Sequence, residues 1–170
     1  MKVKLDDTSP GHRALMQLLR TADMVWNASH AFFERWELSP SQFNVLNLLY
    51  LTPEGLSQID LSRELIMHRS NVTGLVDRLE KRSLVARNAG VDRRTYRVVL
   101  TRVGRELMED VLPRYYEGAV RVWEGLSEER ADEVIAELET VAKNAERIGK
   151  AVATPKSEHQ NPKEDRKAGI

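Results

Sequence analysis

The chain contains no cysteine among its 170 residues. Disulfide bonds, thiol-based redox switches and thiolate metal sites are therefore excluded. Long apolar runs are missing as well, because no stretch approaches the roughly 18 apolar residues that a membrane-spanning helix needs. The first residues, MKVKLDDTSPGHR, lack the apolar core of a secretion signal. We therefore expect a soluble, cytoplasmic protein without a membrane partner.

An excess of either charge is also absent, since 26 Lys and Arg residues balance 26 Asp and Glu residues. This balance hides an asymmetry along the chain. Residues 57–105 hold 11 basic and 5 acidic residues, whereas residues 106–149 hold 5 basic and 12 acidic residues. A basic block confined to one segment is typical of a surface that binds phosphates. Overall neutrality therefore does not argue against nucleic-acid binding.

The most informative segment begins near residue 68, where the apolar spacing predicts an amphipathic helix. Val72, Leu75, Val76 and Leu79 recur at i, i+3, i+4 and i+7, so they share one buried face. The opposite face carries short polar residues beside arginines, namely Arg69, Ser70, Asn71, Thr73, Gly74 and Arg78. Such a face suits the major groove of DNA, where base edges offer hydrogen-bond donors and acceptors. The alternative is an ordinary solvated surface helix.

A β-hairpin is predicted directly after this helix. Residues 84–87 and 96–100 are rich in Val, Leu and Tyr, and Asn88-Ala89-Gly90 supplies turn chemistry between them. Asp92, Arg93 and Arg94 then fall at or near the tip. Adjacent arginines at the end of a ribbon can enter a narrow minor groove, and Asp92 is close enough to restrain Arg94. The alternative is a loop of solvated charge.

Capping residues predict helices before this segment. A long first helix extends from about Ser9 to Trp36. Ser39 then opens a second helix, with Pro40 at its first position and Gln42 completing a capping box. Ser57 caps a third helix with Asp60 three residues later, and we expect three of its residues to face the core: Ile59, Leu61 and Leu65.

Two more helices are expected after the hairpin. Thr101 is the predicted N-cap of a fifth helix, in which Pro113 predicts a kink or a break. Ser127 caps a sixth helix. The first, fifth and sixth helices carry apolar stripes, which a second copy of the chain would bury. Residues 150–170 are polar, so we expect a disordered tail there.

These elements predict a mainly α fold with a small β-hairpin wing, of the α+β class. It is a winged helix-turn-helix with long N- and C-terminal dimerisation helices. We assign residues 1–36 to an N-terminal dimerisation helix and residues 37–105 to the DNA-binding domain. Residues 106–149 form the C-terminal dimerisation helices and residues 150–170 the tail.

Over residues 10–149 the chain resembles the MarR family of bacterial transcription regulators. The specific motifs are LSPSQFNVLNLL and the run from SQIDLSRELIMHRSNVTGLVDRLEKRSLV through ARNAGVDRRTYRVVLTRVGREL. The resemblance implies a dimeric winged-helix protein that usually represses genes until a small ligand releases it. It also implies base contacts from the helix that begins near Arg69, and a minor-groove contact from Arg94, held by Asp92.

The candidate DNA contacts are Ser57, Arg69, Ser70, Asn71, Thr73, Arg78, Asp92, Arg93 and Arg94. Three residues depart from the family pattern. His68 stands where the family often has a small capping residue, and Thr95 follows Arg94 where a glycine is common. Ser83 replaces a frequent glycine after the recognition helix, where a left-handed conformation is expected at a cost of about 1 kcal/mol.

An effector site is predicted on the first helix. Trp26, His30 and Phe33 lie at i, i+4 and i+7 on one face, and they would suit a small aromatic acid. The alternative is that the two apolar rings are core and His30 is a structural histidine. The four histidines, His12, His30, His68 and His159, lie in four separate segments, so we expect no metal site and no cofactor.

The sequence therefore favours a sequence-specific DNA-binding transcription regulator that is a ligand-responsive repressor. Its partners would be double-stranded DNA with a pseudo-palindromic operator, a second copy of the chain and a small aromatic acid. The alternative is a helical protein–protein adaptor whose winged helix does not bind DNA. We do not expect an enzyme, because no parallel strand with a Gly-rich cofactor loop follows residue 105.

Overall fold

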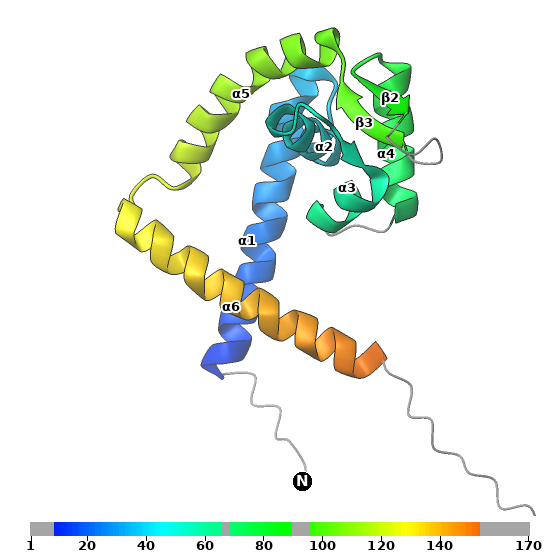
Figure 1. The fold of residues 1–170 in the computed structure, drawn as a ribbon. Helices are drawn as coiled ribbons and strands as arrows, with labels where there is room; N and C mark the ends of the chain where they lie inside the picture. The colour runs from blue at the N-terminus through cyan, green and yellow to red at the C-terminus, as the bar shows by residue number, and fades with distance from the viewer. Residues whose placement is uncertain (1–8, 66–68, 90–95, 154–170) are drawn as a thin grey trace, which may run out of the picture. The chain divides into compact units, whose positions relative to one another are not determined.

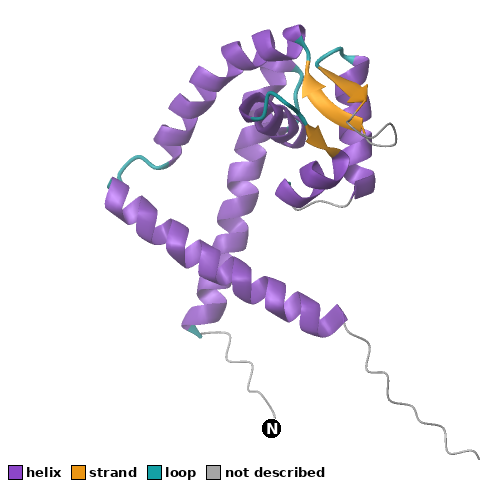
Figure 2. Cartoon of the chain, in the orientation of Figure 1, coloured by secondary structure: helices purple, strands orange, loops and turns teal. Residues whose placement is uncertain are grey.

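The computed structural model describes residues 9–65, 69–89 and 96–153. It divides into two compact units, Met1–Gly118 and Ala119–Ile170. Figures 1 and 2 show the helices and the small sheet. In chain order the elements are α1 (Pro10–Phe33), the 3₁₀ turn η1 (Glu34–Trp36), α2 (Pro40–Leu51), β1 (Leu56–Ser57), α3 (Gln58–Glu64), α4 (Arg69–Lys81), β2 (Val85–Ala89), β3 (Tyr96–Leu100), α5 (Arg102–Val122) and α6 (Glu128–Ala153).

Local capping places the helix starts where the sequence predicted them. The hydroxyl of Ser39 accepts a hydrogen bond from the N–H of Gln42 at 3.2 Å, and the Gln42 side chain accepts one from the Ser39 N–H at 2.8 Å. This capping box satisfies donors that the first turn of α2 would otherwise leave unpaired. Thr101 caps α5 by accepting from the Gly104 N–H at 3.0 Å, and Ser127 accepts from the Arg130 N–H before α6.

The first helix is slightly shorter than predicted. α1 ends at Phe33 and tightens into η1, after which Glu37 takes a left-handed conformation with φ 54°. The predicted left-handed position after α4 is confirmed, because Ser83 has φ 59°. A residue with a Cβ atom is strained there, which is why glycine is the usual choice.

The sheet has three antiparallel strands in the order β1-β3-β2. The sequence predicted only the hairpin, and β1, with its two residues, was missed. The turn predicted at Asn88-Ala89-Gly90 is wrong for its first two residues, because β2 runs on through Ala89. Asn88 pairs with Arg97 and Ala89 with Tyr96, so the ladder holds these residues extended.

One apolar core joins the winged-helix elements, and α2, α3 and α4 contact the sheet around it (Figure 1). The predicted buried face of α4 is confirmed, since all four of its apolar residues are buried in this core. Phe33 at the end of α1 stacks on Phe43 of α2, with ring centroids 4.3 Å apart. In α3, Leu61 is buried, but Ile59 is 44% exposed, so its predicted core position is wrong. It lies on the solvent side of a helix of only seven residues.

α5 runs without interruption through Pro113, so the break that the proline predicted does not occur. Pro113 is exposed, and the helix is anchored to the core by Met108, Val111 and Leu112 just before it. Packing of this apolar face offsets the hydrogen bond that proline removes.

The second unit contains the last turn of α5 and the whole of α6. Gly125, with φ 92°, lies in the turn between them. α6 extends to Ala153, four residues into the segment predicted as a tail, and residues 154–170 lie outside the described residues. No helix in the described ranges combines the length and the apolar character that crossing a membrane would need.

Candidate nucleic-acid interface

The helix-turn-helix consists of α3 and α4, which are held together by polar as well as apolar contacts. The hydroxyl of Thr73 on α4 donates to the side-chain carbonyl of Gln58 on α3 at 3.1 Å. Thr73, predicted as a base contact, is therefore half-buried against α3. Its hydroxyl helps to fix the angle at which α4 is presented.

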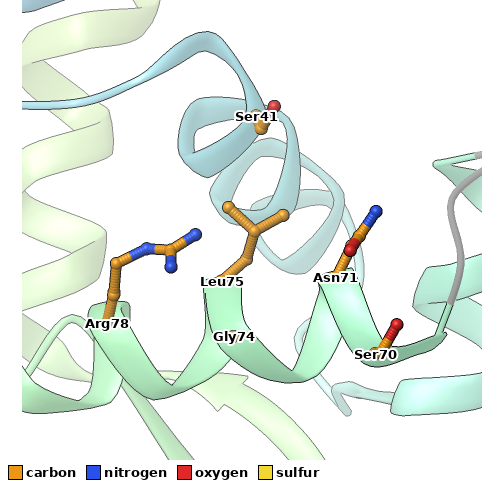
Figure 3. Close-up of a pocket in the computed structure, with 6 residues that line it drawn as sticks. All are labelled: Ser41, Ser70, Asn71, Gly74, Leu75 and Arg78. Atoms are coloured by element: carbon orange, nitrogen blue, oxygen red, sulfur yellow. The ribbon is translucent and has the colours of Figure 1, made fainter.

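The solvent face of α4 carries Ser70, Asn71 and Arg78, all of them exposed. Together with Gly74 and Leu75 they line a shallow hollow, and Ser41 at the start of α2 completes its wall (Figure 3). In the close-up, Asn71 and Arg78 rise from α4 on either side of Leu75, and Ser41 lies across from them. The hollow therefore brings together three predicted DNA contacts and one residue that the sequence did not single out.

Three other arginines of the basic segment have structural partners. Arg87 on β2 donates to the carboxylates of Asp77, at 2.5 Å, and Glu80, and so ties the wing to α4. Arg97 on β3 donates to the backbone carbonyl of Gly55 at 2.5 Å, which holds the strand to the turn before β1. Because charge-assisted hydrogen bonds are the stronger ones, these contacts fix the wing against the helix-turn-helix.

Arg82 acts in the same way at the end of α4. Its guanidinium donates to the carbonyls of Trp36 at 3.0 Å and Glu37 at 2.6 Å, both in the segment that joins α1 to α2. The Trp36 indole N–H in turn donates to the carboxylate of Asp110 on α5 at 2.7 Å. This hydrogen bond is the main cause that lowers the pKa of Asp110. The end of α4 is thereby connected through one segment to both α1 and α5.

Among the described residues, Arg78 has no hydrogen bond and no ion pair with the rest of the protein. It is exposed, and none of the described residues that line the hollow carries a carboxylate. Its charge is therefore available to an anion outside the chain.

Ser57, another predicted DNA contact, is the N-cap of α3. Its hydroxyl accepts from the Asp60 N–H at 3.1 Å and donates to the Asp60 carboxylate at 2.7 Å. The second of these bonds is the main cause that lowers the pKa of Asp60. The Ser57 hydroxyl therefore serves the fold of α3.

The remaining predicted contacts belong to two segments of the chain. Asp92, Arg93 and Arg94, which the sequence predicted near the tip of the hairpin, lie outside the described residues, as do His68 and Thr95. Arg69 is the first residue of α4, at the end that a recognition helix directs toward base edges.

The structure separates the three residues of the predicted effector site. The rings of Trp26 and His30 meet edge-on with centroids 5.5 Å apart. Phe33 is buried and stacks on Phe43, with Tyr115 at 6.0 Å on the same aromatic cluster. Trp26 and His30 thus lie together on α1, while Phe33 belongs to the core. Within the described part of the chain, no three acidic or histidine side chains form a group that could hold a metal ion.

Two functional candidates were missed by sequence reasoning. Ser41 lies inside a capping box, and that pattern announces a helix start but gives no sign that the residue faces α4. Arg82 contacts residues more than 40 positions earlier in the chain, and no local spacing predicts this.

Comparison with known proteins shows what this chain is similar to. The model of the MarR family matches residues 36–95. An HTH-type transcriptional regulator of Bacillus cereus is 26% identical over 142 residues, which span 83% of this chain and 95% of the relative.

Two solved structures of one similar protein carry ligands. The transcriptional repressor CouR bound to a 23-mer DNA duplex is 27% identical, with a TM-score of 0.66 over 84% of this chain and 99% of that one. CouR from Rhodococcus jostii RHA1 bound to p-coumaroyl-CoA has a TM-score of 0.72 at 27% identity, over 79% and 95% of the two chains.

Proposed function

Since this chain is a MarR family transcriptional regulator, we propose that it is a ligand-responsive repressor that binds a pseudo-palindromic operator as a homodimer. The observation that carries the proposal is the solvent face of α4. This face presents Ser70, Asn71 and Arg78 around a hollow without a carboxylate. A face of this composition suits the donors and acceptors of base edges and the negative charge of the backbone.

The contacts divide by position on the winged helix. Arg69, Ser70 and Asn71 occupy the first turn of α4, the part of a recognition helix that contacts base edges. We assign Arg94 to the adjacent minor groove, with Asp92 and Arg93 as its neighbours in the sequence. The DNA complex of CouR supports this use of the fold.

The partner subunit would cover the apolar faces of the outer helices. α1 exposes Leu15, Leu19, Met24, Val25 and Trp26. α6 exposes Ile135, Leu138, Val141 and Ile148, at helical spacing. Apolar stripes of this extent on a soluble regulator mark an interface, and a two-fold dimer buries the same stripe from both copies. A two-fold dimer also matches two operator half-sites about one helical turn apart.

The effector would be an aromatic acid or its thioester. Trp26 and His30 offer an aromatic face beside an imidazole that can donate a hydrogen bond or carry positive charge. The p-coumaroyl-CoA complex of CouR supports this chemical class. Binding would favour a dimer geometry in which the two α4 helices no longer match the half-sites, and the DNA would be released.

The test is a binding titration of the purified chain with its own upstream DNA and with a random duplex of equal length, at two salt concentrations. We expect selective binding to the upstream duplex, with affinity that falls steeply as salt rises. Addition of p-coumaroyl-CoA or free p-coumarate should release the duplex. Equal, weak affinity for this duplex, the random duplex and any duplex selected from a random library would favour the adaptor function instead.

A further inference from the structure

Gly74 lies in the interior of α4, and nothing within the described chain explains why it is a glycine. A glycine inside a helix costs about 1 kcal/mol relative to alanine. A Cβ atom added at Gly74 would meet only the guanidinium of Arg78, at 3.6 Å, which is an ordinary contact. The protein itself would therefore accept alanine at this position.

Two other glycines, Gly55 and Gly104, are required by close neighbours. At Gly55, φ is +77° and an added Cβ would lie 2.4 Å from the carbonyl oxygen of Val98. At Gly104 the corresponding distance to the carbonyl oxygen of Leu84 is 2.0 Å. Gly74 has neither a positive φ nor a close neighbour. No contact within the described residues therefore requires a glycine at this position.

The surroundings of Gly74 indicate what approaches it. It lies in the hollow of Figure 3, between Asn71 and Arg78 on α4 and opposite Ser41 on α2. The floor is Leu75, only 5% exposed, and the rim is polar without a carboxylate. Arg78 is the charged group of this rim, and its guanidinium has no protein partner among the described residues. The site therefore suits an anion with several oxygen acceptors.

We propose that a backbone phosphate of bound DNA occupies this hollow, with Arg78 donating to its oxygens and Gly74 providing the clearance. This inference rests on the proposed function and assigns Arg78 to the backbone instead of a base. Arg78 lies nine residues after the start of α4, which is about 13 Å along the helix axis. The major groove is only about 12 Å wide. When the first turn of α4 lies in the groove, a residue about 13 Å further along the helix therefore reaches the DNA backbone at its edge.

The first test compares two glycine-to-alanine variants. Gly74→Ala should raise the melting temperature but weaken binding about tenfold, both to a duplex selected from a random library by the wild-type protein and to a random duplex, because a phosphate contact is independent of sequence. Gly149→Ala is the matched control, since Gly149 lies inside α6 with nothing within 4 Å of an added Cβ. It should also raise the melting temperature, and, once gel filtration shows that the dimer is intact, leave DNA affinity unchanged. Unchanged affinity of Gly74→Ala would overturn the inference.

The second test locates the phosphate. Single phosphates of the selected duplex are replaced in turn by neutral methylphosphonates, and each duplex is titrated with wild-type protein and with Arg78→Ala. At one position per half-site, the replacement should weaken the binding of the wild type about tenfold and leave the affinity of Arg78→Ala unchanged. Arg78→Ala should also lower the slope of log affinity against log salt by about one per half-site.

The outcomes of these experiments separate the phosphate contact from the regulator function. One outcome is that the selected duplex binds tightly while each methylphosphonate lowers the affinity of the wild type and of Arg78→Ala equally. In that case the phosphate assignment is wrong, and the proposed regulator function is retained. If Arg78→Ala relaxes selectivity at one base pair instead, Arg78 is a base contact. If the library yields no selected duplex at all, both the proposed function and this inference fail.

Discussion

Gly104→Ala should strongly destabilise the chain, because the start of α5 is pressed against the backbone before β2. The Leu84 carbonyl accepts a hydrogen bond from the Thr101 N–H at 3.1 Å, so it lies directly beside the first turn of α5. A Cβ on Gly104 would lie 2.0 Å from that carbonyl oxygen and 3.0 Å from Cδ2 of Leu100. Carbon and oxygen atoms in contact need about 3.3 Å. The first turn of α5 must therefore move by more than about 1 Å.

The magnitude follows from three contributions. Overpacking that forces a backbone shift costs about 1–3 kcal/mol, and here the obstacle is a carbonyl that cannot change rotamer. Loss of the Thr101–Leu84 hydrogen bond adds about 1 kcal/mol. The better helix propensity of alanine offsets about 1 kcal/mol. The net loss in the free energy of unfolding is about 2 kcal/mol, which corresponds to a fall of about 4–8 °C in the melting temperature for a chain of this size.

The measurement is thermal unfolding followed by circular dichroism, with urea unfolding as an independent probe. Gly149→Ala serves again as the control, because the same chemical change in α6 meets nothing within 4 Å. It should raise the melting temperature slightly. A melting temperature for Gly104→Ala equal to or above that of the wild type would show that the contact between α5 and Leu84 is not as close as the structure has it.

Three further predictions concern charged and polar contacts. Arg94→Ala should weaken operator binding by about 1–3 kcal/mol in a fluorescence titration, with the dimer intact on gel filtration, and unchanged affinity would contradict the minor-groove role. Arg87→Ala should lower stability by about 1 kcal/mol in urea unfolding and also weaken DNA binding, because it leaves Asp77 and Glu80 uncompensated on α4. Trp36→Phe removes the hydrogen bond that lowers the pKa of Asp110. Because the pKa of Asp110 is lower in the folded state than in the unfolded state, its carboxylate stabilises the fold above the unfolded-state pKa, near 4. This stabilisation is lost as the pH falls through the folded-state pKa. The stability difference between wild type and Trp36→Phe should therefore be largest near neutral pH and shrink in acid, and a difference that stays constant would refute the linkage.

Features that depend on neighbours along the chain could be predicted from the sequence. The caps at Ser39, Ser57, Thr101 and Ser127 each join residues three positions apart. The buried face of α4 could be predicted because its apolar residues recur with the period of a helix, a pattern that is visible in this segment alone. Ser83 was expected to be left-handed because the family that the chain resembles often has a glycine at this position.

Features that depend on distant residues could not be predicted. β1 is too short to show a strand pattern, and it exists because Leu56 and Ser57 pair with Val98 and Arg97 some 40 residues later. Ile59 has the apolar character of a core residue, yet the orientation of a seven-residue helix leaves it exposed. The apolar spacing of α1 could not distinguish Phe33, which stacks in the core, from Trp26 and His30.

In the basic segment, residues 57–105, the partners of each arginine matter more for DNA binding than the number of arginines. Its count of 11 basic residues indicated a surface that binds phosphates. Arg87 is instead bound to Asp77 and Glu80, the two carboxylates of α4. These carboxylates would repel a DNA backbone if they were unpaired, so Arg87 favours DNA binding without contacting DNA. Arg78, with no such partner among the described residues, is then free to act on the ligand directly. A substitution at Arg87 should consequently weaken binding equally to all sequences, as a backbone contact would, and a loss restricted to one base pair would contradict this division of roles.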